Sequence, residues 1–404
     1  MTVSTTEIID NPMRRAMPAL IDDGAPTAFH RKLEGYRPTP LYDLTRLANE
    51  LGLRHLYVKD ESDRLGLPAF KILGASWASY RALVQRVGHE PEWSTLDELA
   101  GALRRIGHVS LTTATDGNHG RAVASFARRV GLQAHIFVPD GTSAARINAI
   151  RSEGASCQVV AGGTYEDAVA RARDEAGEDC LVVSDTSWEG YVTVPARVIE
   201  GYSTIFREID DQLAAGSVPP PDAVLVQSGV GALAAAAAAR YRRDPTDVTR
   251  LICVEPDTAD CLMESVRAGH ETEVAGPHPS IMAGLNCGRP SPVAFPAVAA
   301  GFDQFCAIGD ADAILAMRTF AAAGIVSGET GASGLAALLG LGGADGLGLP
   351  PGSAVLLLST EGATDPAFYE TTVGHGADAI RLARPPCIAG GTCPVNSCGG
   401  NCAV

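Results

Sequence analysis

The chain has little positive charge for its size. Its 404 residues include 32 Lys and Arg against 47 Asp and Glu, which gives a formal net charge of -15 and an isoelectric point near 5.0. Nucleic acids and anionic membrane surfaces bind basic faces, so this balance argues against both as the main partner. We expect a globular protein with an acidic surface, and 46% hydrophobic residues are enough to form its core.

Long apolar runs are also missing. A run such as Ala232 to Ala239 is far too short to cross a bilayer. The first 24 residues contain no continuous apolar segment of the kind found in signal peptides, and they do not resemble a transit peptide. These features predict a cytoplasmic protein that does not act at a membrane.

Short apolar segments typical of strands alternate with helical stretches from about residue 53 onward. This alternation predicts an α/β fold, in which largely parallel, twisted sheets are flanked by helices on both faces. Ligands of such sheets bind at the carboxyl ends of the strands. The predicted strands are 56–58, 109–113, 134–138, 157–160, 181–184, 223–227, 251–254 and 354–358.

Glycines and prolines punctuate the middle of the chain and favour two domains. We predict a discontinuous large domain, residues 1–85 and 201–384, with a small domain of residues 86–200 inserted between its halves. Residues 385–404 follow as a tail that is rich in Gly, Pro and Cys. Because the tail has no apolar periodicity, we expect it to be flexible and without a core of its own.

A glycine-rich loop follows the predicted strand 223–227. The free backbone N–H groups and the dipole at such a helix start form an anion site, and glycines let a phosphate approach the backbone closely. The loop lacks the third glycine of a dinucleotide fingerprint and the Lys-Ser/Thr pair of a P-loop. A tight turn without a ligand is the alternative interpretation. The candidate phosphate-binding residues are Ser228, Gly229, Val230, Gly231 and Ala232.

A second loop, residues 113–120, also connects a strand to a helix. Its hydroxyl and backbone N–H groups are suited to a substrate carboxylate, Asn118 can donate to a ring oxygen, and Asp116 can transfer a proton. An Asp that caps the helix next to an Asn-containing turn is the alternative. The candidate substrate-binding residues are Thr115, Asp116, Gly117 and His119.

Lys71 opens a helix directly after a polar loop, and the two glycine-containing loops follow it. This order predicts a lysine that holds a phosphorylated aldehyde cofactor, although a lysine at a helix start is ordinarily a solvated charge. Asp185 follows a predicted strand and is a second candidate acid, with helix capping as its alternative. A hydroxyl after strand 354–358 can meet a pyridine nitrogen, and we prefer Ser359 to Thr360 for this contact.

Seven motifs in chain order resemble the diaminopropionate ammonia-lyases, which are fold-type II pyridoxal-phosphate enzymes of the tryptophan synthase β-like group. The likeness covers about residues 10–375. The sequences Asp-Thr-Ser-Trp-Glu-Gly-Tyr at 185–191 and Met-Ala-Gly-Leu-Asn-Cys-Gly at 282–288 are its specific parts. The other motifs lie at 59–71, 113–120, 229–232, 327–332 and 359–365.

The resemblance implies a two-domain fold-type II enzyme with pyridoxal 5'-phosphate as its cofactor. Lys71 becomes the Schiff-base lysine, and Asp116 and Asp185 become the acid/base residues. Asn118 becomes the partner of the pyridoxal 3'-oxygen, and the loop from Ser228 to Ala232 binds the phosphate. The enzyme is expected to be a homodimer that acts on a small amino acid.

The implied reaction is the elimination of ammonia from D- or L-2,3-diaminopropionate, through aminoacrylate, to pyruvate and a second ammonia. Use of both isomers is chemically reasonable if Lys71 takes the α-proton from one face and an aspartate takes it from the other. The first alternative is another pyridoxal-phosphate β-elimination or β-replacement on serine, threonine or cysteine derivatives. An alternative of another class is a non-catalytic scaffold that presents the Cys-rich tail to a metal or a modifying partner.

Six of the ten cysteines are scattered through the body, where we expect mainly small core residues. The spacing of the tail cysteines lacks a Cys-x-x-Cys knuckle, so we predict no metal site, with a soft-metal site there as the alternative. The resemblance implies that Cys261 and Cys287 are neighbours that can oxidise, although a reducing cytosol favours two thiols. The tail cysteines, whose partner is unknown, are Cys387, Cys393, Cys398 and Cys402.

Overall fold

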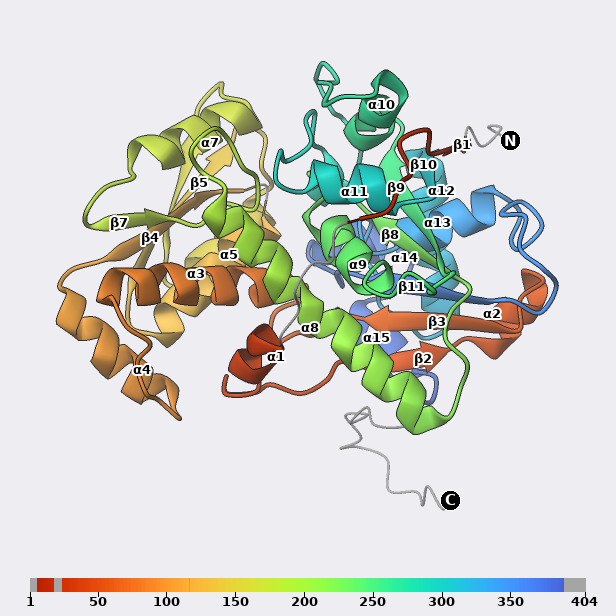
Figure 1. Cartoon of the computed structure of the whole chain (residues 1–404), viewed down its shortest axis with the longest axis horizontal. Coiled ribbons are helices and arrows are strands. Elements are labelled where there is room, and N and C mark those ends of the chain that lie inside the picture. The colour runs from red at the N-terminus through yellow and green to blue at the C-terminus, as the bar shows by residue number, and fades with distance from the viewer. Residues whose placement is uncertain (1–5, 18–23, 116, 389–404) are drawn as a thin grey trace.

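The computed structural model describes residues 6–17, 24–115 and 117–388, and its larger sheet forms one side of the molecule (Figure 1). The strands of this sheet are β1 (Glu7–Asp10), β2 (Leu41–Asp43), β3 (His55–Asp60), β8 (Ala223–Gln227), β9 (Arg250–Pro256), β10 (Gln304–Ile308) and β11 (Ala354–Ser359). They lie in the order β1-β10-β9-β8-β11-β3-β2. The five inner strands are parallel, whereas β1 and β2 pair antiparallel at the two edges.

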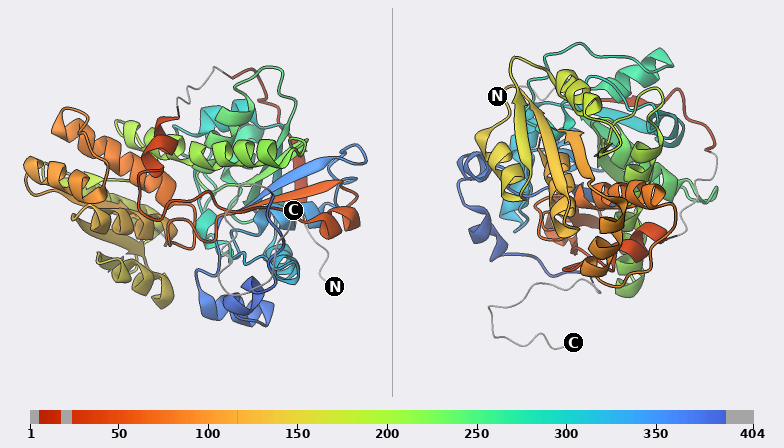
Figure 2. Two further views of the ribbon diagram at one scale, coloured as in Figure 1. Left: turned by 90° about the horizontal axis from the view of Figure 1, so that it is seen from below. Right: turned by 90° about the vertical axis from the view of Figure 1, so that its left-hand side faces the viewer.

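The smaller sheet has four strands in the order β6-β5-β4-β7, and every pair is parallel. Figures 1 and 2 show it beside the larger sheet, with α5 (Asn118–Arg129) and α7 (Tyr165–Asp174) packed against it. Its strands are β4 (Ser110–Ala114), β5 (Gln133–Pro139), β6 (Ser156–Val160) and β7 (Cys180–Val182). The fold is therefore the predicted α/β type, with largely parallel sheets flanked by helices.

The remaining helices complete the layers around the two sheets. They are α1 (Ala25–His30), α2 (Thr45–Glu50), α3 (Ile72–Val87), α4 (Leu96–Leu103), α6 (Ala144–Ser152), α8 (Thr193–Gly216), α9 (Ala232–Tyr241), α10 (Cys261–Ala268), α11 (Phe295–Gly301), α12 (Asp310–Ala322), α13 (Ser333–Gly340), α14 (Pro366–Val373) and α15 (Ala377–Arg381). Short 3-10 turns occupy Arg104–Ile106 and Ala283–Leu285. No helix in the described part of the chain has the length and apolar character needed to cross a membrane.

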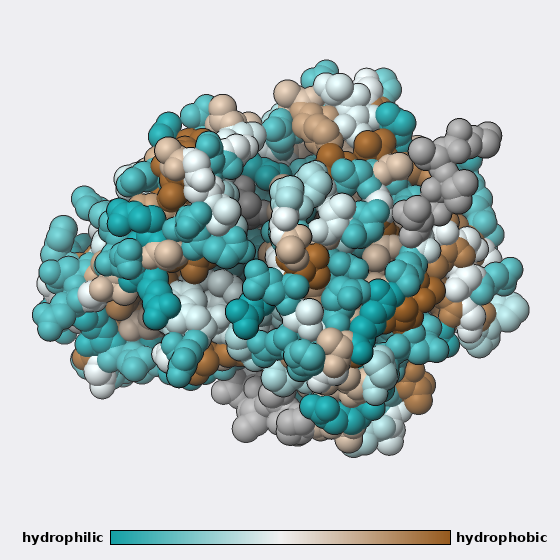
Figure 3. Space-filling model, turned by 90° about the horizontal axis from the view of Figure 1, so that it is seen from above, coloured by the Kyte–Doolittle hydropathy of each residue, from teal (hydrophilic) through white to brown (hydrophobic). Residues whose placement is uncertain are grey.

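Strand β8 shows why the larger sheet is buried on both faces. Its residues alternate between two hydrophobic cores: Val224 and Val226 pack into one, whereas Ala223 and Leu225 pack into the other. A strand covered on both faces needs a continuous apolar run, as this segment has. The surface in Figure 3 is mostly hydrophilic, with apolar side chains in small separate groups.

Helices α3 and α8 make a close crossing just after Lys71. A Cβ atom added to Gly74 would lie 2.6 Å from the ring of Tyr202, and one added to Gly201 would lie 2.6 Å from the carbonyl oxygen of Leu73. Both contacts are shorter than side chains tolerate, so glycine is required on each helix for the backbones to approach. The crossing fixes the start of α3, and therefore Lys71, against the long helix α8.

A buried ionic cluster holds the segment between β3 and α3 on the same long helix. Lys59 Nζ lies 2.8 Å from Glu208 Oε2, and Arg64 contacts both Glu61 and Glu208 at 2.6 Å. All four side chains are at most 3% exposed. Buried charges are tolerated when they are fully hydrogen-bonded, and this cluster contributes a rigid base below the loop that leads to Lys71.

All eight predicted strands are present, with ends that differ by at most two residues. The sequence analysis missed β1, β2 and β10. The first two are edge strands of four and three residues, whose ladders depend on partners distant in the chain. Such edge strands are defined by tertiary pairing more than by local propensity. β10, by contrast, has four apolar residues after Gln304 and the same length as β8, and the sequence analysis overlooked it.

Candidate active site

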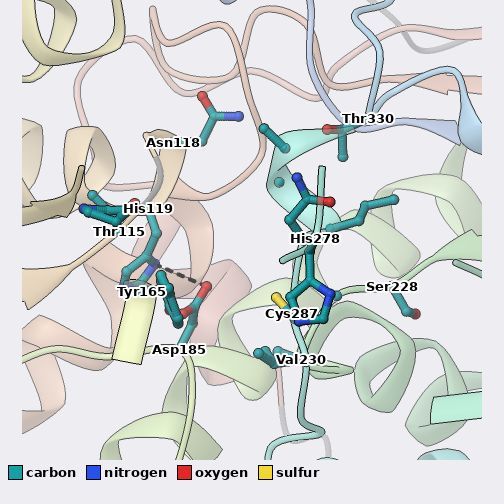
Figure 4. Close-up of a pocket in the computed structure, with 18 of the residues that line it drawn as sticks. Thr115, Asn118, His119, Tyr165, Asp185, Ser228, Val230, His278, Cys287 and Thr330 are labelled. Carbon is teal, nitrogen blue, oxygen red and sulfur yellow. Dashed lines mark ion pairs between the residues drawn. The ribbon is translucent and has the colours of Figure 1, made fainter. Parts of the chain in front are cut away.

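A cavity of about 760 Å³ lies where the two sheets meet (Figure 4). Loops after β4, β5 and β6 line one side, and loops after β8 and β11 line the other. These loops follow the carboxyl ends of parallel strands, where α/β proteins bind ligands. The volume is in the range of small-molecule and cofactor sites.

Lys71 is one of only three lysines in the chain. It precedes the first turn of α3 and lines the cavity. The other two have different surroundings: Lys59 is buried in the ionic cluster, and Lys32 is exposed and donates to the Trp93 carbonyl at 3.1 Å. Lys71 is therefore the only lysine whose amine can reach a ligand in this cavity.

Asp185 lies directly beside that amine. Its Oδ2 accepts a hydrogen bond from Lys71 Nζ at 2.7 Å, and the residue is only 7% exposed. Burial favours the neutral acid, but the charges of Lys71 and His119 outweigh it and hold the pKa of Asp185 well below its ordinary value. Asp185 is thus an ionised acceptor in contact with the lysine.

His119 supports the same carboxylate from the other side. Its Nδ1 lies 3.8 Å from Asp185 Oδ2, as the dashed line in Figure 4 marks, and its Nε2 lies 2.8 Å from the Val183 carbonyl oxygen. A carbonyl only accepts, so Nε2 carries a proton and Nδ1 faces Asp185. The predicted residue His119 is therefore at the site, in contact with the candidate acid.

The glycine-rich loop forms a cradle of backbone N–H groups at the start of α9. Within the described part of the chain, the N–H groups of 229–232 form no hydrogen bond with the protein, and Ser228 Oγ is buried next to the Cys253 thiol. A Cβ atom on Gly229 would lie 2.9 Å from Cys287 Sγ, so the close backbone approach requires glycine there. These donors fit a phosphate group, as the sequence predicts.

The second loop contributes Asn118 and Thr115. Thr115 Oγ1 accepts from the Gly117 N–H at 2.9 Å, and Asn118 Nδ2 donates to Glu361 Oε2. Thr115, Asn118 and His119 all line the cavity, whereas Gly117 is buried behind it. The predicted acid Asp116 lies outside the described residues.

At the end of β11 the two hydroxyl candidates point to different places. Thr360 lines the cavity, and its Oγ1 accepts from Gln227 Nε2 at 2.9 Å. Ser359 is fully buried and its hydroxyl donates to Ser327 Oγ at 2.9 Å. Because neighbouring residues of an extended chain point to opposite sides, this arrangement favours Thr360 and does not support our preference for Ser359.

The sequence analysis missed an ion pair at the edge of the cavity. Arg146 on α6 contacts Glu329 Oε1 at 3.1 Å. Burial and the neighbouring carboxyl group of Glu361 outweigh this contact and raise the pKa of Glu329 to about 7. No local sequence signal identifies Arg146, whereas Glu329 lies in the motif 327–332.

The sequence analysis also missed Gln227. This residue is the polar end of an apolar strand, a feature that could have identified it as a site residue.

Cys261 and Cys287 both lie next to the phosphate cradle. Cys261 Sγ donates weakly to the Gly229 carbonyl at 3.9 Å, and Cys287 Sγ is close to the same glycine. Their proximity is as the resemblance implies, and no disulfide joins them in the described structure. Burial raises the pKa of the Cys261 thiol well above its ordinary value, so its reactive thiolate is disfavoured.

Cys387 is the one tail cysteine among the described residues. Its backbone forms an antiparallel β-bridge with Tyr42 on the edge strand β2, and the N–H of the next residue, Ile388, donates to the Leu41 carbonyl at 2.8 Å. Cys393, Cys398 and Cys402 lie outside the described residues. Within the described part, no three His, Cys, Asp or Glu side chains are placed to hold a metal ion.

Comparison with known proteins gives a consistent result at every level. Residues 32–361 match the family model described as pyridoxal-phosphate dependent enzyme. The chain is 38% identical over 367 residues to a diaminopropionate ammonia-lyase of Escherichia coli K12, and the match covers 87% of this chain and 91% of the relative.

Solved structures of the Escherichia coli enzyme share the fold. One is a diaminopropionate ammonia lyase in complex with D-serine, with a TM-score of 0.84 and 35% identity over 92% of this chain and 97% of that chain. Another contains an aminoacrylate-PLP azomethine reaction intermediate and matches with a TM-score of 0.81 and 34% identity, again over 92% and 97% of the two chains.

Proposed function

Because the chain belongs to the diaminopropionate ammonia-lyases of the pyridoxal-phosphate dependent enzyme family, we propose that it eliminates ammonia from 2,3-diaminopropionate. Pyruvate and two molecules of ammonia are formed for each diaminopropionate and water consumed. The observation that carries this proposal is the pair Lys71 and Asp185, 2.7 Å apart in a cavity with a phosphate cradle. The enzyme is a carbon-nitrogen lyase.

The cavity residues fit pyridoxal phosphate in four places. Lys71 would hold the aldehyde carbon, and the N–H groups of 229–232 with Ser228 Oγ would hold the phosphate. Asn118 would donate to the 3'-oxygen, and Thr360 would face the pyridine nitrogen. When bound, pyridoxal phosphate withdraws electrons from the substrate α-carbon.

Lys71 has the position of a proton-transfer group as well as of an anchor. Its amine would be placed to take or return the substrate α-proton, and Asp185 lies close enough to exchange a proton with it or to hold its charge. His119 Nδ1 lies 3.8 Å from the same carboxylate, and a protonated His119 would add positive charge beside it. This arrangement gives one face of the substrate a complete acid/base pair.

We assign the opposite face to Asp116. The α-protons of D and L substrates point to opposite sides, so one base on each side allows both isomers to react. A second carboxylate also suits the extra positive charge of a diamino acid, because the β-ammonium must give up a proton to leave as neutral ammonia. The motif position of Asp116, which follows the cavity residue Thr115 in the sequence, supports this assignment.

A substrate panel tests the proposed function. Purified protein loaded with pyridoxal phosphate should release pyruvate and ammonia from D- or L-2,3-diaminopropionate. Activity with serine, or with O-acetylserine and sulfide, together with none on diaminopropionate would favour the alternative β-elimination or β-replacement activity. A colourless protein that does not change the spectrum of added pyridoxal phosphate would favour the non-catalytic scaffold.

We also propose the finer features that the sequence suggests. The large domain would comprise residues 1–85 and 201–384 and the small domain residues 86–200. The two sheets support this division, since β4 to β7 all lie between residues 110 and 182. We propose a cytoplasmic homodimer by analogy with the family; light scattering and cell fractionation test these two points.

A further inference from the structure

Glu361 is a buried acid in the cavity to which the proposed reaction gives no role. It follows β11, is 2% exposed and lines the cavity wall. Its Oε2 accepts from Asn118 Nδ2, and its Oε1 accepts from the Thr330 N–H at 3.1 Å. Figure 4 shows the amide nitrogen of Asn118 turned toward the side of the cavity where Thr330 lies.

The carboxylate determines how the Asn118 amide is oriented. Asn118 Nδ2 donates to Glu361 Oε2, so the NH2 end of the amide faces the carboxyl group, and the reversed amide would turn its oxygen toward the carboxyl oxygens. The NH2 group has two N–H bonds, and Glu361 uses one of them. The second N–H and the carbonyl oxygen of Asn118 are then held in one orientation relative to the cavity.

The surroundings of Glu361 keep its carboxylate in place. A Cβ atom added to Gly328 would lie 3.2 Å from Oε1, and one added to Gly331 would lie 2.6 Å from the Glu361 carbonyl oxygen. Burial raises the pKa of Glu361, and the charge of Arg146 with the donors on Thr330 and Asn118 offsets this rise only in part. The side chain is therefore fixed by packing on one side and by two hydrogen bonds on the other.

We propose that Glu361 is a positioning residue that fixes the Asn118 amide so that it presents an N–H to the pyridoxal 3'-oxygen. The inference rests on the proposed function, because it requires the cofactor. It links two elements from different sheets, since Asn118 begins α5 and Glu361 follows β11. The oriented amide would bind the cofactor without rearrangement, which strengthens binding.

A double-mutant cycle on cofactor affinity tests the proposal. The dissociation constant of pyridoxal phosphate is measured by titration for the wild type, E361Q, N118A and the double variant. Gln offers one acceptor where two donors converge, so E361Q should weaken binding roughly tenfold, as expected when a buried hydrogen bond to a charged group is broken. In the N118A background the same substitution should change the constant less than about twofold, because its effect passes through Asn118.

The matched control is E153Q, which alters a buried acid that pairs with Arg121 and Arg128 and does not line the cavity. It should leave the affinity and the visible spectrum of the bound cofactor close to those of the wild type, whereas E361Q should shift the spectrum. If E361Q weakened cofactor binding equally in the wild-type and N118A backgrounds, or if E361Q bound the cofactor with wild-type affinity, the inference on Glu361 would be overturned while the proposed function would stand. A wild-type protein that does not bind pyridoxal phosphate would instead refute the proposed function.

Discussion

Lys71 Nζ and Asp185 Oδ2 lie 2.7 Å apart, although 113 residues separate them in the chain. Lys71 comes from the start of α3 and Asp185 from the loop after β7 of the smaller sheet. The pair is formed only when the two sheets are in place beside each other. The reacting amine therefore depends on both halves of the fold.

Modification of lysine should be confined to one residue. Borohydride reduction of the cofactor-loaded protein should leave a pyridoxyl group on Lys71, because it is the only one of the three lysines that lines the cavity. Peptide mass mapping measures this. K71A should carry no label and have no measurable lyase activity, whereas K32A, which alters an exposed lysine, should be labelled like the wild type. Label on Lys59 in folded protein would contradict the assignment.

Substitution of the two aspartates should separate the substrate isomers. We expect D185N to lower kcat for one isomer of diaminopropionate by about 10²- to 10⁴-fold, the usual contribution of a general acid or base, with a much smaller effect on the other isomer. D116N should show the opposite preference. Initial rates with each pure isomer measure this; equal losses for both isomers in either variant would refute the two-face assignment.

Gly229, in the phosphate-binding loop, should not tolerate a side chain. G229A places a Cβ atom 2.9 Å from Cys287 Sγ and 3.2 Å from the Gly284 carbonyl oxygen, so the loop must shift. We expect at least about tenfold weaker binding of pyridoxal phosphate, the cost of losing a charge-assisted hydrogen bond. G177A is the control, because a Cβ atom there meets nothing within 4 Å. Equal affinities in the two variants would argue against a phosphate at this loop.

The two hydroxyls after β11 should differ in importance. T360A removes a group that lines the cavity, and it should lower kcat/KM and shift the cofactor absorption spectrum. S359A removes a hydroxyl that bonds Ser327, away from the cavity, so the spectrum should stay unchanged and the main effect should be on stability. The reverse result would restore Ser359 as the partner of the pyridine nitrogen.

The pH dependence of stability should reveal Glu329. Burial raises its pKa from about 4.5 to about 7 in the folded protein. A raised folded pKa means that its contribution to stability is fully present below pH 4.5 and is lost as the pH rises to about 7. The free energy of unfolding of the wild type should therefore fall relative to that of E329Q, by on the order of 1 kcal/mol per pH unit in this window. Denaturant titrations at several pH values measure this difference. If the free energies of unfolding of the wild type and E329Q changed with pH in parallel, the pKa of Glu329 would not be raised.

Local pattern predicted the strand-loop-helix units of the site well. The strand 223–227 and its glycine loop have the predicted bounds, because an apolar run followed by Gly-x-Gly is defined within a few residues. Arg146 and Glu329 could not be paired from the sequence, because 182 residues separate them in the chain. The contact between Glu361 and Asn118 could not be predicted for the same reason, since the two residues are distant in the chain. The choice between Ser359 and Thr360 depended on the direction in which each side chain points.

Positions at the close crossing of α3 and α8 tolerate less substitution than positions at the rim of the cavity. A Cβ atom on Gly201 would meet the backbone of Leu73, and one on Gly74 would meet the ring of Tyr202, so a larger residue at either position would disturb the start of α3 next to Lys71. The cavity rim at 164–166 and 273–278 has no such restriction, and most of its residues are at least partly exposed. A mutagenesis library aimed at new amino-acid substrates should therefore vary the rim and leave both glycines untouched.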